Sequence, residues 1–163
     1  MENKESAKSR RAFVANSGAV AGLSAFAGLF ASNAHANSSD INAMGSTPEQ
    51  LEAYVQLPSD RPIVAVNLLK FSDKNSYEVY QNKVASLVGR VGAEIIFSGD
   101  VQLTRIGGAD AEWDRVLMIR FPNTGGIMEM VRLPEYREFH KFRAKGLEGQ
   151  VNLTVFENEP DVS

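Results

Sequence analysis

One stretch near the end of the chain carries residues whose types and spacing suit a reaction. They are Tyr136, His140, Arg143 and Leu147. Intervals of three or four residues place side chains on one face of an α-helix. There an imidazole near its ordinary pKa can move a proton at neutral pH, and a guanidinium can hold a carboxylate or a developing enolate oxygen. We therefore expect His140 to act as a general acid/base and Arg143 to bind an oxygen of the substrate.

Two polar residues outside this stretch could assist the same reaction. Asn67 stands in the middle of an apolar run, where its amide could orient a substrate carbonyl, and Asp114 could fix the tautomer of His140. A structural role is the alternative for each. Asn67 would then satisfy backbone groups near a bulge, and His140 would lie at the helix surface. Asp114 would pair with Arg143 or Arg115.

Aromatic side chains are candidates for the walls of a pocket that takes a small hydrophobic molecule. They are Trp113, Tyr77, Tyr80 and Tyr136. Aromatic residues at such spacings are also common in cores, so that role stays open for them. The chain has no cysteine, which excludes disulfides and thiol catalysis, and its scattered acidic residues predict no metal site. A formal net charge of −3 predicts no nucleic-acid partner.

These side chains need a scaffold, which the hydrophobic pattern predicts. Apolar and β-branched runs indicate strands at residues 63–71, 95–103, 113–121 and 151–156. The second and third runs are joined by a loop with two adjacent glycines and should pair as a hairpin. Between the first two runs, helical spacing predicts a helix with a possible Ser76 cap and a left-handed Gly92 at its end.

Two more helices follow from local signals. Thr47 and the proline and glutamine after it form the pattern of a capped N-terminus, so a short helix should begin there. Towards the end of the chain, helical spacing starts near Ile127 and is broken at Leu133–Pro134. It then restarts, carries Leu147 on its apolar stripe, and should end at Gly149.

The element order is therefore β-α-β-β-α-β, the arrangement of ferredoxin-like α+β domains, with both helices on one face of a four-stranded antiparallel sheet. Along the third strand, Leu117 and Ile119 would face one way while Val116 and Met118 face the other. Both sheet faces are then too apolar for water. We expect a homodimer, a dimeric α/β barrel in which a second copy covers the free face.

The N-terminal region has the pattern of an export signal. Arg10 and Arg11 precede a moderately apolar segment, and Ala34-His35-Ala36 has the small residues that a signal peptidase requires. The surroundings of the arginine pair resemble the twin-arginine signal, which bacterial export machinery recognises on folded proteins. We expect cleavage near Ala36 and a periplasmic or secreted product. A retained membrane anchor is the alternative.

The chain accordingly divides into four segments. They are a twin-arginine signal peptide at 1–36, a flexible tether at 37–46, a short helix with its lead-in at 47–61, and the barrel domain at 62–158. Only the last segment is long enough to bury a core and hold a site.

Several short motifs follow one another in a specific order. They are Arg61-Pro62, Asn67-Leu68-Leu69-Lys70-Phe71, Tyr77 with Tyr80, Val91-Gly92, Trp113-Asp114, and Pro134-Glu135-Tyr136 with His140 and Arg143. In this order they resemble the family called domain of unknown function 1330, which belongs to the dimeric α/β-barrel superfamily. The resemblance runs from about Leu57 to Phe156.

The resemblance implies a fold and a range of activities. The superfamily includes cofactor-free monooxygenases, lactone isomerases, haem-degrading enzymes and haem peroxidases, so the fold alone does not select a reaction. One hypothesis is a small enzyme, with no cofactor expected, that acts on an apolar carbonyl compound or phenol with His140 as general acid/base. The alternative is a non-catalytic module that binds a small hydrophobic ligand, or haem with His140 as axial ligand.

Overall fold

The computed structural model describes residues 45–107 and 112–158 of the chain. The predicted export signal, its cleavage site near Ala36 and most of the predicted tether lie outside these residues. Within the described ranges, no helix has the length and apolar character that crossing a membrane requires.

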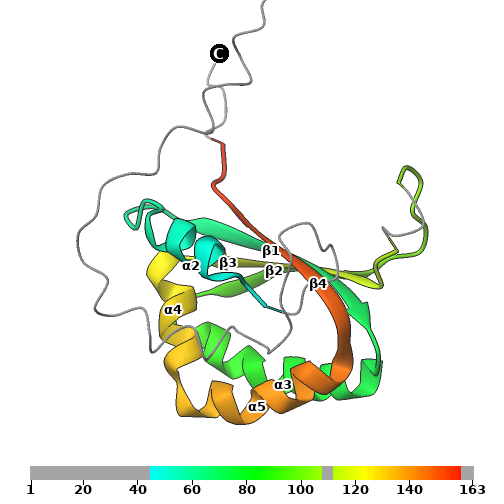
Figure 1. Ribbon diagram of the computed structural model, residues 1–163. Helices are drawn as coiled ribbons and strands as arrows, with labels where there is room; N and C mark the ends of the chain where they lie inside the picture. Colours follow the sequence, from blue (N-terminus) through cyan, green and yellow to red (C-terminus); the bar gives the residue numbers. More distant parts are fainter. Residues whose placement is uncertain (1–44, 108–111, 159–163) are drawn as a thin grey trace, which may run out of the picture.

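A four-stranded antiparallel sheet is the framework of the domain (Figure 1). Its strands are β1 (Ile63–Phe71), β2 (Glu94–Asp100), β3 (Arg115–Phe121) and β4 (Leu147–Val155). They lie in the order β2-β3-β1-β4, with β2 and β3 paired as the predicted hairpin. The β2–β3 pairing is interrupted by a register shift between Ile95 and Phe97.

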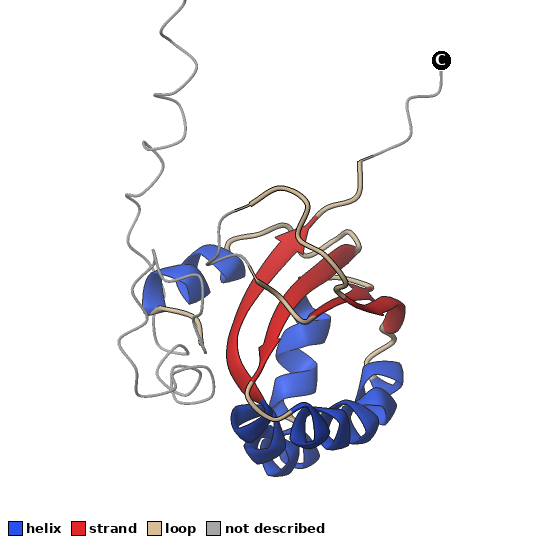
Figure 2. Cartoon of the chain, turned by 90° about the vertical axis from the view of Figure 1, so that its right-hand side faces the viewer, coloured by secondary structure: helices blue, strands red, loops and turns tan. Residues whose placement is uncertain are grey.

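Two long helices cover one face of this sheet (Figure 2). They are α3 (Lys74–Arg90) and α5 (Pro134–Gly146), while the shorter α2 (Pro48–Val55) and α4 (Thr124–Arg132) lie near one end of the sheet in Figure 1. The α2 helix is fixed to α4 by the Tyr54 hydroxyl, which donates to the Thr124 carbonyl at 2.7 Å. The predicted ferredoxin-like α+β fold is confirmed.

The helix starts follow from local chemistry. Thr47 and Gln50 form the predicted reciprocal cap of α2, with Pro48 in the first turn. The cap of α3 is Asp73, not Ser76, because the Asp73 carboxylate accepts the Ser76 backbone N–H at 3.2 Å. Gly92 follows α3 with φ +70°, a conformation that favours glycine, as predicted.

The end of the last helix differs from the prediction. The break at Leu133–Pro134 is present, but α5 ends at Gly146, and Leu147 begins β4 instead of extending the helical stripe to Gly149. A Cβ atom on Gly146 would lie 2.6 Å from the Tyr77 backbone nitrogen. The chain therefore passes against the start of α3 at this glycine and turns directly into the sheet.

The two faces of the sheet have different surroundings. The inner face, which α3 and α5 cover, carries core side chains such as Ile63, Leu69, Leu117, Ile119 and Phe121. Directly paired residues point to the same side, so Phe97 and its partner Met118 belong to the opposite, outer face. On that outer face large apolar side chains are exposed: Phe97, Leu153 and Val155.

Candidate functional site

The predicted stripe on the last helix is present for three of its four members. Tyr136, His140 and Arg143 lie on α5, and Tyr136 packs against the core. The Nη2 atom of Arg143 donates a hydrogen bond to Oε1 of Gln150 on β4. Because Gln150 pairs with the core residue Leu69, this bond joins α5 to the inner face of the sheet.

The guanidinium of Arg143 is an unusual cation for a partly buried position. Among the described residues, every ion pair involves some other arginine or lysine. Burial has the largest single influence and opposes the charge of Arg143, whereas electrostatic interaction with Tyr136, Tyr80 and Tyr77 raises its pKa, and the net shift of the pKa is upward. The guanidinium thus stays charged without a carboxylate beside it, a state that an anionic ligand would stabilise.

His140 precedes Arg143 by about one helical turn. Its ring lies 6.2 Å from the ring of Tyr136, measured between centroids. Burial, and secondly the positive charge of Arg143, lower the pKa of His140 from 6.5. The imidazole is therefore mostly neutral at pH 7 and can accept a proton.

Aromatic rings lead from the end of β1 towards His140. Ring centroids are 5.2 Å apart for Phe71 and Tyr77, 5.5 Å for Tyr77 and Tyr80, and 6.3 Å for Tyr80 and Tyr136. The Tyr80 and Tyr136 hydroxyl oxygens are 3.5 Å apart. Burial raises the pKa of Tyr77 to about 12 and that of Tyr80 well above its ordinary value, so both phenols stay protonated. Tyr77 and Tyr80 are core residues, and Tyr136 is only partly buried.

Asn67 belongs to the inner face of β1, between the helices and the sheet. Its Nδ2 atom donates to the Ala65 carbonyl at 3.2 Å and to the Leu117 carbonyl at 3.0 Å. The amide donor is thus used by backbone groups, which fits the structural alternative. Its Oδ1 atom is an acceptor, so a ligand hydroxyl, and not a ligand carbonyl, would suit this residue.

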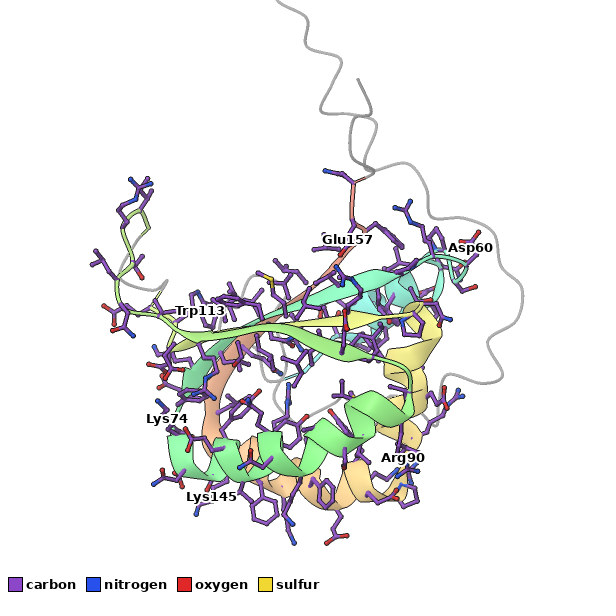
Figure 3. All side chains as sticks on the ribbon, turned by 180° about the vertical axis from the view of Figure 1, so that it is seen from behind. Asp60, Lys74, Arg90, Trp113, Lys145 and Glu157 are labelled. Carbon is purple, nitrogen blue, oxygen red and sulfur yellow. The ribbon has the colours of Figure 1, made fainter. Side chains whose placement is uncertain are left out.

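Asp114 and Trp113 are placed outside the cluster around His140. The Asp114 carboxylate accepts the Phe71 backbone N–H at 2.6 Å, and its own N–H donates to the Leu69 carbonyl at 2.8 Å. It therefore joins β1 to the start of β3 instead of holding the imidazole. Figure 3 shows Trp113 at the end of the sheet from which the β2–β3 connection leaves.

An accessible polar strip borders the cluster on β4. Asn152 pairs with Asn67, and Thr154 pairs with Ala65, so both belong to the inner face. Both are exposed, unlike the buried Gln150 on the same side of the strand. The helices therefore leave this part of the inner face open to solvent.

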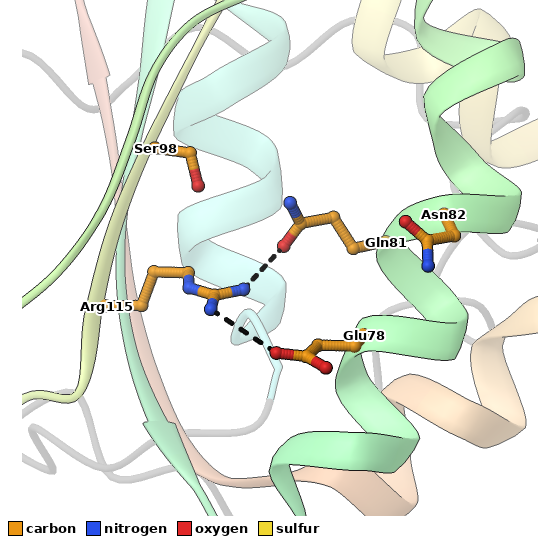
Figure 4. A pocket seen from close by; sticks show the side chains of 5 residues that line it. All are labelled: Glu78, Gln81, Asn82, Ser98 and Arg115. Carbon is orange, nitrogen blue, oxygen red and sulfur yellow. Dashed lines mark hydrogen bonds and ion pairs between the residues drawn. The ribbon is translucent and has the colours of Figure 1, made fainter.

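A second arginine, Arg115, lies between the sheet and α3 in a different setting. A cavity of about 340 Å³ is lined there by Glu78, Gln81, Asn82, Ser98 and Arg115 (Figure 4). The Arg115 guanidinium lies 2.6 Å from Asp100 and 3.7 Å from Glu78, and donates to Gln81 at 2.9 Å. The hydrogen bond from Arg115 is the main cause that lowers the pKa of Asp100 to about 2. Two carboxylates thus compensate this cation.

Gln150, the partner of Arg143 on the sheet, is not among the site residues that the sequence predicts. It falls between the predicted helix end at Gly149 and the predicted strand start at residue 151, so strand alternation could not assign its side chain to a face of the sheet. Extending the alternation by two positions from Asn152 would have placed Gln150 on the inner face. Within 45–107 and 112–158, no group of three histidine, cysteine, aspartate or glutamate residues is placed to hold a metal ion.

Solved structures confirm the fold. Two crystal structures of one protein of unknown function from Rhodopseudomonas palustris are similar to this chain. The first is 24% identical, with a TM-score of 0.66, over 71% of this chain and 96% of that one. The second, of the methylated protein, is 22% identical, with a TM-score of 0.69, over 75% and 99%. At these identities the likeness shows the fold alone.

A more distant neighbour is a cofactor-independent oxygenase from Streptomyces nogalater. It is 8% identical, with a TM-score of 0.47, over 63% of this chain and 99% of that one. A likeness at this TM-score does not indicate what this chain does. No curated protein gives a significant match. The model of a family described as a domain of unknown function, DUF1330, matches residues 63–157, and the chain therefore belongs to that family.

Proposed function

We propose that the domain is a small cofactor-independent enzyme that moves a proton on an aromatic carbonyl compound. The observation that carries this proposal is the neutral imidazole of His140 beside the guanidinium of Arg143, which has no carboxylate partner among the described residues. A base and a cation at this spacing fit a reaction that creates negative charge on oxygen.

The reaction that fits best is enolisation. His140 takes a proton from the carbon next to the carbonyl group. The electron pair of the broken C–H bond forms a C=C bond, and the π pair of the carbonyl group moves onto its oxygen. Arg143 holds the resulting enolate oxygen. The imidazolium then gives the proton to that oxygen, which leaves the enol and the neutral base. No oxidant or cofactor enters this sequence.

The remaining side chains fit the ligand that this reaction requires. The partly buried ring of Tyr136 offers an aromatic surface beside His140, and the buried Tyr80 packs behind it. The exposed Asn152 and Thr154 mark the side from which a ligand would enter.

Phenylpyruvate is a direct probe, because it joins an aromatic ring to an enolisable ketone and a carboxylate. We expect the domain to accelerate keto–enol conversion, followed by ultraviolet absorbance. His140→Gln should slow it by about 100-fold or more, the usual contribution of a general acid/base. Glu138→Gln, which changes an exposed carboxylate on the same helix, is the matched control and should keep the wild-type rate.

Wild-type rates in the His140→Gln variant would contradict this assignment. A Soret band in the purified protein that disappears in the same variant would instead support the alternative, a haem-binding module with His140 as axial ligand. Binding of phenylpyruvate without conversion would leave a binding module for small hydrophobic ligands.

We also propose that a second copy of the chain packs on the outer face, giving a homodimer. Phe97, Leu153 and Val155 are 51%, 48% and 41% exposed there, which is an apolar surface that water does not favour. Phe97→Glu would place a charge in this interface. We expect a dimer for the wild type and a monomer for the variant in native mass spectrometry, and a monomeric wild type would contradict the proposal.

Finally, we propose export through the twin-arginine machinery. The support is the Arg10-Arg11 pair and the Ala34-His35-Ala36 sequence. The intact mass of protein recovered outside the inner membrane should correspond to a chain that begins at Asn37. Replacement of both arginines by lysine should keep the protein in the cytoplasm.

A further inference from the structure

Gln150 is the residue that Arg143 contacts on the sheet. It is 6% exposed and lies on β4 opposite Leu69. Its Oε1 atom accepts the hydrogen bond from Nη2 of Arg143. The amide thus sets the direction of the guanidinium, because an arginine presents its donors in a fixed planar fork.

The chemistry of the amide matters as much as its position. A glutamine oxygen accepts a hydrogen bond but brings no negative charge, whereas a glutamate of nearly equal shape would form an ion pair. Arg115 has charged partners instead, since the carboxylates of Asp100 and Glu78 compensate its charge. At Arg143, the neutral partner orients the cation and leaves its charge available.

We infer that Gln150 is a specificity-determining residue, which keeps the charge of Arg143 available for the carboxylate of an aromatic acid. This rests on the proposed function, because it concerns the same guanidinium. The ring of the acid would lie against Tyr136, and its carboxylate would take the donors of Arg143 that Gln150 does not use. The substrates are then aromatic acids with an enolisable carbonyl group, not neutral ketones or phenols.

Phenylacetate and phenylacetamide test this inference, because they have nearly the same shape and differ in charge, and neither needs to react. Their dissociation constants can be measured by isothermal titration calorimetry at pH 7. We expect the wild type to bind phenylacetate at least about tenfold more tightly, as a charge-assisted pair in a partly buried site should give. Equal affinity for the two probes would overturn the inference.

Two substitutions at one position separate charge from shape. Gln150→Glu should weaken phenylacetate binding by about tenfold or more and change phenylacetamide binding by less than about twofold. Gln150→Met, which removes the amide without adding a charge, should keep the preference for phenylacetate. An unchanged preference in Gln150→Glu would overturn the inference. If that variant does not fold, loss of the preference in Gln150→Met would overturn it, and its retention would support it.

The binding measurements and the activity measurement with phenylpyruvate test the two proposals separately. A protein that prefers phenylacetate but does not convert phenylpyruvate would disprove the proposed reaction and support the role of Gln150. A protein that converts phenylpyruvate but binds both probes equally would support the reaction and disprove the role of Gln150.

Discussion

Arg115 and Arg143 both reach into the layer between the sheet and its helices, yet their partners differ. Arg115 comes from β3 and has Asp100, Glu78 and Gln81 around its guanidinium. Arg143 comes from α5, donates a hydrogen bond to Gln150 and lies near tyrosine hydroxyl groups. Removing a cation that has carboxylate partners should destabilise the fold, whereas a cation without them is a candidate site for an external anion.

The two regions therefore show that burial alone does not identify a functional arginine. A cavity lies at Arg115, where two carboxylates leave little attraction for an anion. The uncompensated charge lies at Arg143, next to a neutral base. Charge balance, more than the presence of a cavity, distinguishes the two sites.

The largest expected effect is on activity, from Arg143→Met. This change removes the cation that holds the enolate oxygen, so the rate with phenylpyruvate should fall by about 100- to 1000-fold. The free energy of unfolding should fall by only about 1 kcal/mol, because the hydrogen bond to Gln150 is lost but no ion pair is broken. Chemical denaturation measures the second quantity. A large loss of stability would show that Arg143 has a structural role like that of Arg115.

Arg115→Met should give the opposite result. It leaves Asp100 and Glu78 without their shared cation, so stability should fall by about 1–3 kcal/mol, while the rate per folded molecule stays near the wild type. Lys74→Met is the matched control, since Lys74 is an exposed partner of Asp100 at 2.7 Å and should cost less than about 1 kcal/mol. Equal losses in both variants would contradict the distinction.

Gly146→Ala should disturb the Arg143 region through the backbone. The new Cβ atom would lie 2.6 Å from the Tyr77 nitrogen, so α5 and α3 must move apart, at about 1–3 kcal/mol. Gly89→Ala is the control, because nothing lies within 4 Å of its Cβ position, and it should stabilise α3 by about 0.5–1 kcal/mol. Unfolding midpoints of the two variants should move in opposite directions.

The smallest expected effects are two separate dependences of stability on pH. The pKa of His140 is lowered in the fold, so its contribution is present above pH 6.5 and is lost as pH falls through the lower folded value. The pKa of Asp100 falls from 3.8 to about 2, so its contribution is lost only between those values. His140→Gln should remove the first dependence and Asp100→Asn the second. Removal of both by one variant would show that the regions are coupled.

Local signals made most of the fold predictable. Thr47, Gly92 and Pro134 act on the few residues beside them, so their effects on helix ends can be read from sequence. The true end of α5 depends on the contact of Gly146 with Tyr77, which is distant in sequence. The spacing of apolar residues along the sequence does not reveal this contact.

The site was less predictable, because its properties depend on pairings between distant segments. The His140–Arg143 spacing on one helix follows from sequence. The hydrogen bond from Asn67 to the Leu117 carbonyl depends on the register of β1 and β3. In the same way, only the pairing of β4 with β1 brings Gln150 to Arg143.

The register shift in β2 affects how copies of this chain can meet. An unbroken edge strand offers regularly spaced backbone groups, and such edges promote aggregation into extended sheets. The extra residue between Ile95 and Phe97 interrupts that regular spacing on the β2 edge. Association by continuing the sheet from one molecule to the next is thereby disfavoured, which is consistent with the face-to-face pair proposed above.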